Sequence, residues 1–112
     1  MAPIERIDSA DPQLDLVLHA LAHPVRRHLL ELLVVGDAAA GDLAASAAVN
    51  HGISRSRASQ HLAVLAEAGL VDVVVDGTWR WHRLSRLPGA IVHAWLTQLA
   101  SPYARCERPS PE

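Results

Sequence analysis

The chain has 112 residues, half of them apolar, which suits one domain with a real core. No stretch is long and apolar enough to cross a bilayer, so we expect no membrane association. The net charge of −2 excludes recognition of nucleic acid through bulk positive charge.

The N-terminal residues and the cysteine content both indicate a cytoplasmic protein. Residues 1–12 include acids and lack the apolar run of a signal peptide. The single cysteine, Cys106, cannot form an intramolecular disulfide. We therefore expect a protein of the reducing cytoplasm.

The distribution of charge is more informative than its sum. Lysine is absent, and many of the acids lie outside the stretch 54–86. That stretch contains Arg55, Arg57, Arg80, Arg83 and Arg86. A local excess of arginine suits a phosphate-binding face, although a coding preference for arginine over lysine predicts the same composition.

The first half of the chain predicts three helices. Residues 1–10 lack apolar periodicity and are expected to form a flexible tail. Asp11-Pro12 predicts the start of a helix over 12–22, because Asp caps a helix and Pro favours its first position. His23-Pro24 repeats that signal for a second helix, which Gly36 ends. A third helix is expected over about 41–49, with a poor cap at Ala39.

The second half predicts a helix, a hairpin and a last helix. Ser54 caps a fourth helix that Gly69 ends. The runs VDVVVD and TWRWHRL form two strands around an Asp76-Gly77 turn. Pro88 opens a final apolar helix, and residues 101–112 form a Pro-rich tail. The expected fold is mainly α with a β-hairpin wing, a winged helix-turn-helix over residues 11–100.

The fourth helix has the properties of a DNA recognition helix. Ala58, Leu62 and Leu65 share its core face, while Ser56, Ser59, Gln60 and Ala63 lie opposite. Small polar side chains fit a major groove and bond to base edges, and arginines in the first turn suit phosphate. An isolated helix with this pattern is more often a solvated surface, but the helix before it and the hairpin after it favour DNA. The expected DNA contacts are Ser54, Arg55, Ser56, Arg57, Ser59, Gln60, His61, Arg80 and Arg83.

The hairpin is expected to act as a basic wing. Strand alternation places Trp79, Trp81 and Arg83 on one face and Arg80, His82 and Leu84 on the other. Leu84 suits the core, so we expect His82 to be partly buried. At least one of the hairpin tryptophans is expected to pack rather than bind.

The first and last helices are more apolar than one small domain requires. A shared homodimer interface explains both, and a symmetric dimer reads two half-sites roughly 10 base pairs apart. The expected interface residues are Leu14, Leu18, Ile91, Trp95 and Leu99.

Over about residues 12–100, the chain resembles the ArsR/SmtB family of bacterial winged-helix repressors. LAHPVRRHLLELL is similar to the second-helix signature of that family, and DGTWRWHRLS is similar to its wing. ISRSRASQHLAVLAEAGLV resembles its recognition helix, with Ser54, Ser59, His61, Leu65, Gly69 and Leu70 in matching places. The resemblance implies a homodimer that represses transcription and leaves DNA when an effector binds. The third helix with its turn is about four residues longer than the family pattern GELAxxLGLS, and its weak cap favours fraying.

The metal sites of the family lack their ligands here. The thiolate site needs the pattern ELCVCD, whereas Leu33 and Val35 stand at the ligand positions. The site across the terminal helices needs several ligands, and the last helix offers only His93. Weak candidates for another metal site are His19, His93 and Cys106, but these side chains lack a conventional ligand spacing. We expect no cofactor and leave the effector unassigned.

Two functions remain for this sequence, and neither is enzymatic. The chain shows no nucleophile elbow, phosphate loop or paired carboxylates. The favoured function is a sequence-specific transcriptional repressor that binds a double-stranded DNA operator. The alternative is a winged helix for protein–protein contact without sequence-specific DNA binding, against which the arginines of the fourth helix and the wing argue.

Overall fold

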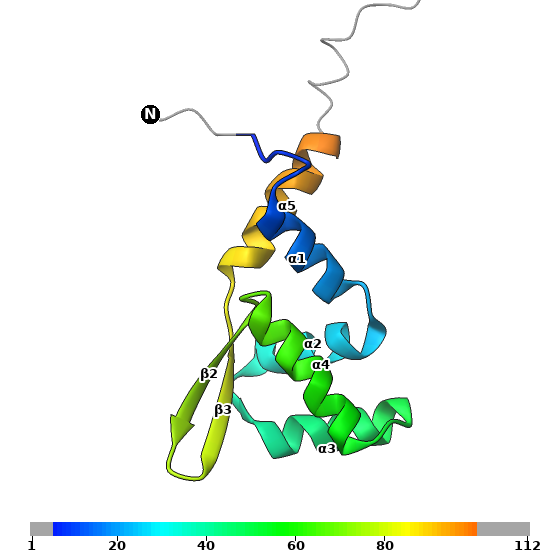
Figure 1. Cartoon of the computed structure of the whole chain (residues 1–112), viewed down its shortest axis with the longest axis vertical. Coiled ribbons are helices and arrows are strands. Elements are labelled where there is room, and N and C mark those ends of the chain that lie inside the picture. The colour runs from blue at the N-terminus through cyan, green and yellow to red at the C-terminus, as the bar shows by residue number, and fades with distance from the viewer. Residues whose placement is uncertain (1–5, 101–112) are drawn as a thin grey trace, which may run out of the picture.

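Five helices and a three-stranded sheet make up the fold in the computed structural model, which describes residues 6–100 (Figure 1). No helix in that range is long and apolar enough to cross a membrane. The winged helix-turn-helix predicted from the sequence is confirmed, with one additional strand. In chain order the elements are α1 (Pro12–Leu21), α2 (Pro24–Val35), β1 (Ala38–Ala39), α3 (Ala40–His51), α4 (Arg55–Glu67), β2 (Val71–Asp76), β3 (Trp79–Leu84) and α5 (Leu87–Ala100).

The first two helices begin where capping side chains satisfy free backbone N–H groups. Asp11 Oδ1 accepts hydrogen bonds from the N–H of Gln13 at 2.8 Å and of Leu14 at 3.4 Å. His23 Nδ1 accepts one from the N–H of Val25 at 3.2 Å. Proline at the first helical position has no N–H to satisfy, so both predicted starts are confirmed.

The third helix is longer than the predicted 41–49 and is anchored by the sheet. Ala39 makes no side-chain capping bond, as its chemistry requires. Instead it belongs to β1, which pairs antiparallel with β3 and sets Ala39 opposite Trp81. Ala39 is also 3% exposed, so sheet pairing and burial fix the chain where α3 begins.

The sheet has the order β1-β3-β2, with β3 in the centre. β2 and β3 form the predicted hairpin around Gly77, whose φ of +63° suits a residue without a Cβ. β2 therefore lies at one edge of the sheet, where Val73, Val74 and Val75 are all exposed. The wing projects from the helical body as a two-stranded ribbon (Figure 1).

Neither tryptophan of the hairpin enters the core, and the packing expected of at least one of them is against the other tryptophan. Trp79 is 57% exposed and Trp81 is 37% exposed. Their rings stack on each other, with centroids 5.7 Å apart and planes 19° apart. The two side chains therefore shield one another from water on the face of β3 that they share.

Successive turns of the helices each contribute buried side chains to the core. Ala58, Leu62 and Leu65 are 0, 3 and 0% exposed, which confirms the predicted buried face of α4. They belong to one buried cluster that takes residues from every helix. Its largest fully buried side chains are those of Leu14, Val17, Leu29, Leu43 and Leu65.

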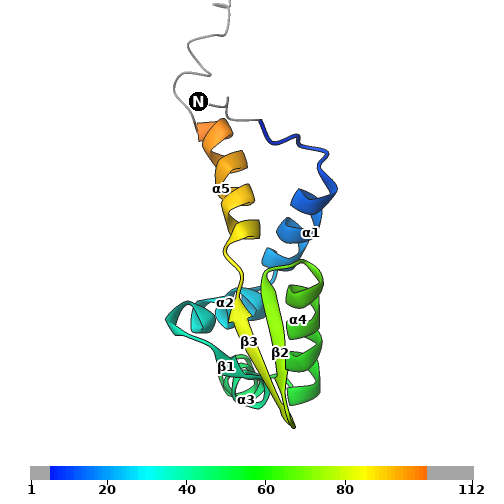
Figure 2. The same ribbon diagram turned by 90° about the vertical axis from the view of Figure 1, so that its left-hand side faces the viewer.

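α1 and α5 pack against each other at the end of the molecule away from the wing tip (Figures 1 and 2). Leu14 of α1 is 1% exposed and lies within the core, so its prediction as an interface residue is wrong. Residues 6–10, expected to form part of a flexible tail, are held to α5. Gln98 Nε2 donates to the carbonyl of Ile7 at 3.2 Å, and Ile7 N–H donates back to Gln98 Oε1.

Truncation of a core leucine tests this packing. Leu29 of α2 is fully buried, so Leu29→Ala is expected to lower the free energy of unfolding by about 2–5 kcal/mol. Val35, in the same helix, is 92% exposed, and Val35→Ala is expected to change it by less than about 0.5 kcal/mol. Urea unfolding at a fixed protein concentration measures both. Equal losses in the two variants would contradict the assigned core.

Candidate nucleic-acid interface

The turn between α3 and α4 sets the direction of the candidate recognition helix. Gly52 ends α3 with a φ of +64°, a left-handed conformation that glycine adopts without strain. Two residues later, Ser54 Oγ accepts a hydrogen bond from the N–H of Arg57 at 3.0 Å. Ser54, predicted as a DNA contact, is exposed. Its hydroxyl oxygen already serves as the N-cap of α4.

The outward face of α4 carries the predicted base-reading side chains. Ser56, Ser59 and Gln60 are all exposed, opposite the buried Ala58 and Leu62. Ser and Gln have both donors and acceptors and can bond to base edges in a major groove. The structure thus brings these three predicted residues together on one accessible stripe.

The first turn of α4 is positively charged. Arg55 and Arg57 are exposed there, and the turn contains no acidic residue. A helix N-terminus carries free N–H groups and a partial positive charge, and the two guanidinium groups add to that charge. This end of α4 therefore suits a phosphate group.

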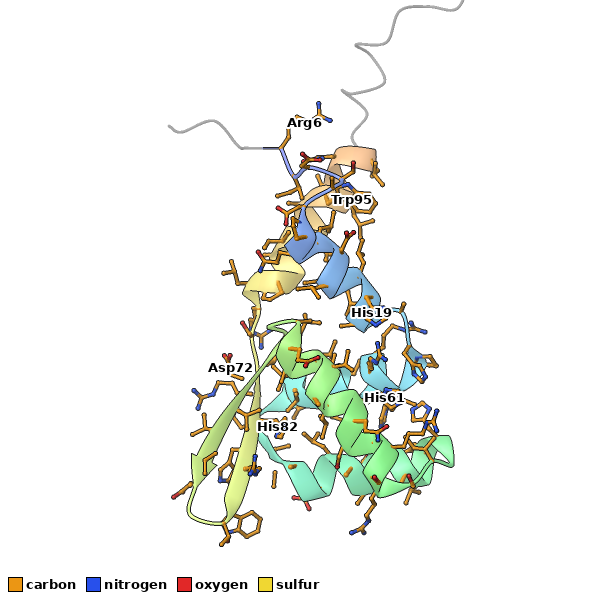
Figure 3. All side chains as sticks on the ribbon, in the orientation of Figure 1. Arg6, His19, His61, Asp72, His82 and Trp95 are labelled. Carbon is orange, nitrogen blue, oxygen red and sulfur yellow. The ribbon has the colours of Figure 1, made fainter. Side chains whose placement is uncertain are left out.

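His61, labelled in Figure 3, lies on the buried side of α4 instead of its exposed side. Its prediction as a DNA contact is therefore wrong. It is 8% exposed, and its Nδ1 accepts a hydrogen bond from Arg26 Nε at 3.1 Å. Its ring centroid is 4.3 Å from that of His23. Burial lowers the pKa of His61, and the neighbouring His23, Arg26 and Arg57 lower it further. A neutral His61 thereby joins α4 to α2.

The two predicted wing arginines have different environments. Arg83 lies opposite Asp72, at the base of the hairpin, and its guanidinium contacts the Asp37 carboxylate at 3.0 Å. That hydrogen-bonded carboxylate raises the pKa of Arg83. Arg83 therefore fastens the wing to the segment before β1, and its prediction as a wing-tip phosphate contact is not supported.

Arg80 occupies the position expected of a wing contact. It lies opposite Val75, one pair from the pair that flanks the turn, and is exposed. Arg80 and Ser59 line the same groove between the wing and α4. His82, on the same face of β3, is 6% exposed, which confirms its predicted burial. The wing arginine and the recognition helix therefore present one continuous surface.

The sequence reasoning missed the partners that hold this surface in place. Arg26 contacts His61, which lies 35 positions away in the chain. Asp37 contacts Arg83, which lies 46 positions away. Arg26 falls in the motif LAHPVRRHLLELL, but a motif does not show which residue its side chain meets. Asp37 had no signal, because it lies outside every predicted element.

The outer surfaces of α1 and α5 form a second candidate interface. Leu18, Ile91 and Trp95 are partly buried against the core, while Leu99 is 64% exposed. Three further leucines that were not predicted are also exposed on these helices, namely Leu16, Leu87 and Leu96 at 54%, 69% and 50%. The exposed leucines leave apolar surface uncovered on this helix pair in the single chain.

The weak metal candidates do not come together in the described part of the chain. His19 and His93 are exposed, and residues 6–100 contain no cluster of three His, Cys, Asp or Glu that could hold a metal ion. Cys106 lies outside the described residues. At the positions of the thiolate site, Leu33 is buried in the core and Val35 is exposed.

Comparison with known proteins places the fold in a class. A family profile described as "Helix-turn-helix domain" matches residues 21–74. An uncharacterized HTH-type transcriptional regulator of Mycobacterium tuberculosis is 46% identical over 57 residues, which are 51% of this chain and 47% of the relative. The match thus spans about half the length of that curated relative. The chain therefore contains a helix-turn-helix domain similar to that of this regulator.

Solved structures narrow this class. A "possible transcriptional regulator for arsenical resistance" is 34% identical with a TM-score of 0.64, covering 84% of this chain and 97% of that one. An ArsR family transcriptional regulator with 24% identity has the same fold, with a TM-score of 0.76 over 92% and 100% of the two chains. The repressor BigR of Xylella fastidiosa is 28% identical with a TM-score of 0.55, over 78% and 85%. The chain belongs to the ArsR family of winged helix-turn-helix regulators.

The two buried imidazoles predict that mild acid weakens the fold. Burial holds the pKa values of His61 and His82 below the usual 6.5. Above that pH both groups are neutral in the folded and unfolded chain. As the pH falls through it, the unfolded chain binds more protons, so the free energy of unfolding decreases. We expect the urea midpoint to drop between about pH 7.5 and about pH 5.5.

Two variants assign this pH dependence. His61→Gln removes one buried imidazole and is expected to flatten the dependence, whereas His93→Gln changes an exposed one and is expected to retain it. A wild-type midpoint that stays constant over the range would show that neither buried histidine resists protonation.

Proposed function

We propose that this protein is a sequence-specific DNA-binding transcriptional repressor that acts as a homodimer and is released by an effector. The observation that carries the proposal is the surface formed by α4 and Arg80. It combines exposed polar side chains on a helix with arginines at the helix start and on the wing. Few functions other than DNA recognition use that combination on a winged helix.

The surface divides the two tasks of recognition between its residues. Ser56, Ser59 and Gln60 are short enough for α4 to approach base edges closely, and they supply the hydrogen-bonding groups that distinguish bases. Arg55, Arg57 and Arg80 supply the positive charge that attracts phosphate regardless of sequence. This local charge operates although the whole chain has a net charge of −2.

The homodimer is supported by the uncovered surface of α1 and α5. Leu16, Leu96 and Leu99 are each at least half exposed, and a soluble protein that leaves such leucines together has an interface to cover. The winged helix-turn-helix domain of a possible ArsR-family regulator from Mycobacterium bovis, similar in fold, is homodimeric. A dimer presents two copies of α4 to two half-sites. Repression is supported by the likeness to BigR, itself a transcriptional repressor.

Two substitutions separate base reading from phosphate attraction. Gln60→Ala is expected to lower the ratio of specific to non-specific DNA affinity, because one base contact is lost. Arg80→Ala is expected to weaken binding to all sequences alike and to reduce the salt slope by about one per protomer. Arg83→Ala is the matched control, since Arg83 is already paired with Asp37. Fluorescence anisotropy measures these affinities at several salt concentrations, with a duplex selected from random sequences.

The outcomes distinguish the parts of the proposal. An unchanged specificity ratio in Gln60→Ala would show that the base-reading stripe lies elsewhere on α4. A wild-type protein that selects no sequence would refute the repressor and favour a winged helix used for contact with another protein.

A charged residue on α5 tests the dimer. Leu99→Glu is expected to convert the dimer to a monomer at micromolar concentration, because a buried carboxylate on each side of a two-fold interface costs several kcal/mol, about 3 or more. Val35→Glu places the same charge at an exposed site on α2 and is expected to remain dimeric. Light scattering after size exclusion gives both masses. A monomeric wild type, or a dimeric Leu99→Glu, would contradict this interface.

A further inference from the structure

A groove of about 310 Å³ separates the recognition helix from the wing. α4 and β2 are joined by the turn at Gly69 and diverge from each other away from that turn (Figure 1). On the helix side the groove is lined by Ala63 and Ala66, whose side chains end at Cβ, and on the strand side by Val73. The hollow exists because the two alanines do not fill the space that the diverging elements leave.

Part of the groove lining is polar and basic. Arg80 and His82 line the groove from β3, and Ser59 lines it from α4. Among the residues that line it, all within the described chain, none is acidic. The groove therefore combines apolar walls with the cationic side chain of Arg80.

His82, labelled in Figure 3, lines this hollow and has an unfilled hydrogen-bonding position. The residue is 6% exposed, and its Nδ1 has no hydrogen-bond partner within residues 6–100. Buried side-chain nitrogens normally have a partner, from protein or from another molecule. An occupant of the groove that carries oxygen atoms would provide one after a small rotation of the imidazole.

We propose that this groove binds a small organic acid with a flat apolar body and a single carboxylate. The body fits between the alanines of α4 and Val73, where its burial removes apolar surface from water. The carboxylate pairs with the Arg80 guanidinium, whose fork of N–H groups matches two carboxylate oxygens. The volume is at the lower end of the range for ligand pockets, which limits the body to about two fused rings. A bare phosphate gains nothing from the apolar walls.

The inference deepens the proposed function, because it rests on Arg80 and Ser59 also serving the DNA surface. An acid in the groove neutralises Arg80 and stands between the wing and α4. Ligand and DNA then compete for the same side chains, and by linkage each lowers the affinity for the other. The organic acid is thus assigned as the class of effector that releases the protein.

Titration of the free protein tests the site without DNA. The probe is 2-naphthoate, followed by isothermal calorimetry and by amide shifts in ¹H–¹⁵N spectra, with uncharged 2-naphthamide as the matched ligand. We expect millimolar or tighter binding of the acid and at least about tenfold weaker binding of the amide. The largest shifts are expected in α4 and β3, at the residues that line the groove.

Three variants locate the ligand. Ala66→Leu fills the groove, and Arg80→Gln removes the cation; each is expected to weaken binding at least about tenfold. Arg83→Gln removes the other wing cation, outside the groove, and is expected to bind as the wild type does. Circular dichroism verifies that each variant is folded, and two independent lesions keep the test valid if one variant is not.

Each result decides for or against the site. Absent binding of 2-naphthoate, equal binding of the amide, or full binding by both Ala66→Leu and Arg80→Gln would overturn it. Inorganic phosphate that competes with 2-naphthoate at equal concentration would assign the groove to the DNA backbone and overturn it as well. If 2-naphthoate leaves the affinity for DNA unchanged, the proposed competition between ligand and DNA is overturned, while the binding data still support the site. Because the titration uses no DNA, failure of the repressor proposal would not affect it.

Discussion

The fold depends on the burial of one face of α4 against α2 and α3. Ala58, Leu62 and Leu65 fix the depth of the helix, and the bond from Arg26 to His61 adds a polar contact beneath it. Helical periodicity then places the residues between these positions on the opposite side. The exposed polar stripe is a geometric consequence of this packing. Any change that rotates α4 against α2 and α3 therefore moves every candidate base contact together.

β3 performs the corresponding task for the wing. As the central strand it pairs with β1 before α3 and with β2, so it connects the helix-turn-helix to the hairpin. Its alternation sends His82 and Arg80 toward α4 and the stacked tryptophans outward. Arg83 reinforces the connection through Asp37. Of these two arginines three positions apart, Arg83 attaches the wing and Arg80 stays exposed beside the groove.

Local signals predicted most of the fold from the sequence, since caps and periodicity act over a few residues. Asp11, His23 and Ser54 cap as expected because each N-terminus is a local arrangement. β1 escaped prediction because two alanines carry no strand signal, and their pairing depends on a distant strand.

The same distinction explains the site. The exposed positions of Ser56, Ser59 and Gln60 follow from the wheel, whereas the burial of His61 depends on Arg26, 35 positions away. Leu14 differs from Leu99 only in which neighbours the fold provides.

The exposed edge strand β2 has a consequence for handling the protein in solution. Two such edges pairing antiparallel about Val74 would set Asp72 of one molecule against Asp76 of the other, and like charges directly opposite disfavour pairing. The acidic residues that flank the exposed valines of β2 thus protect the wing from edge-to-edge aggregation.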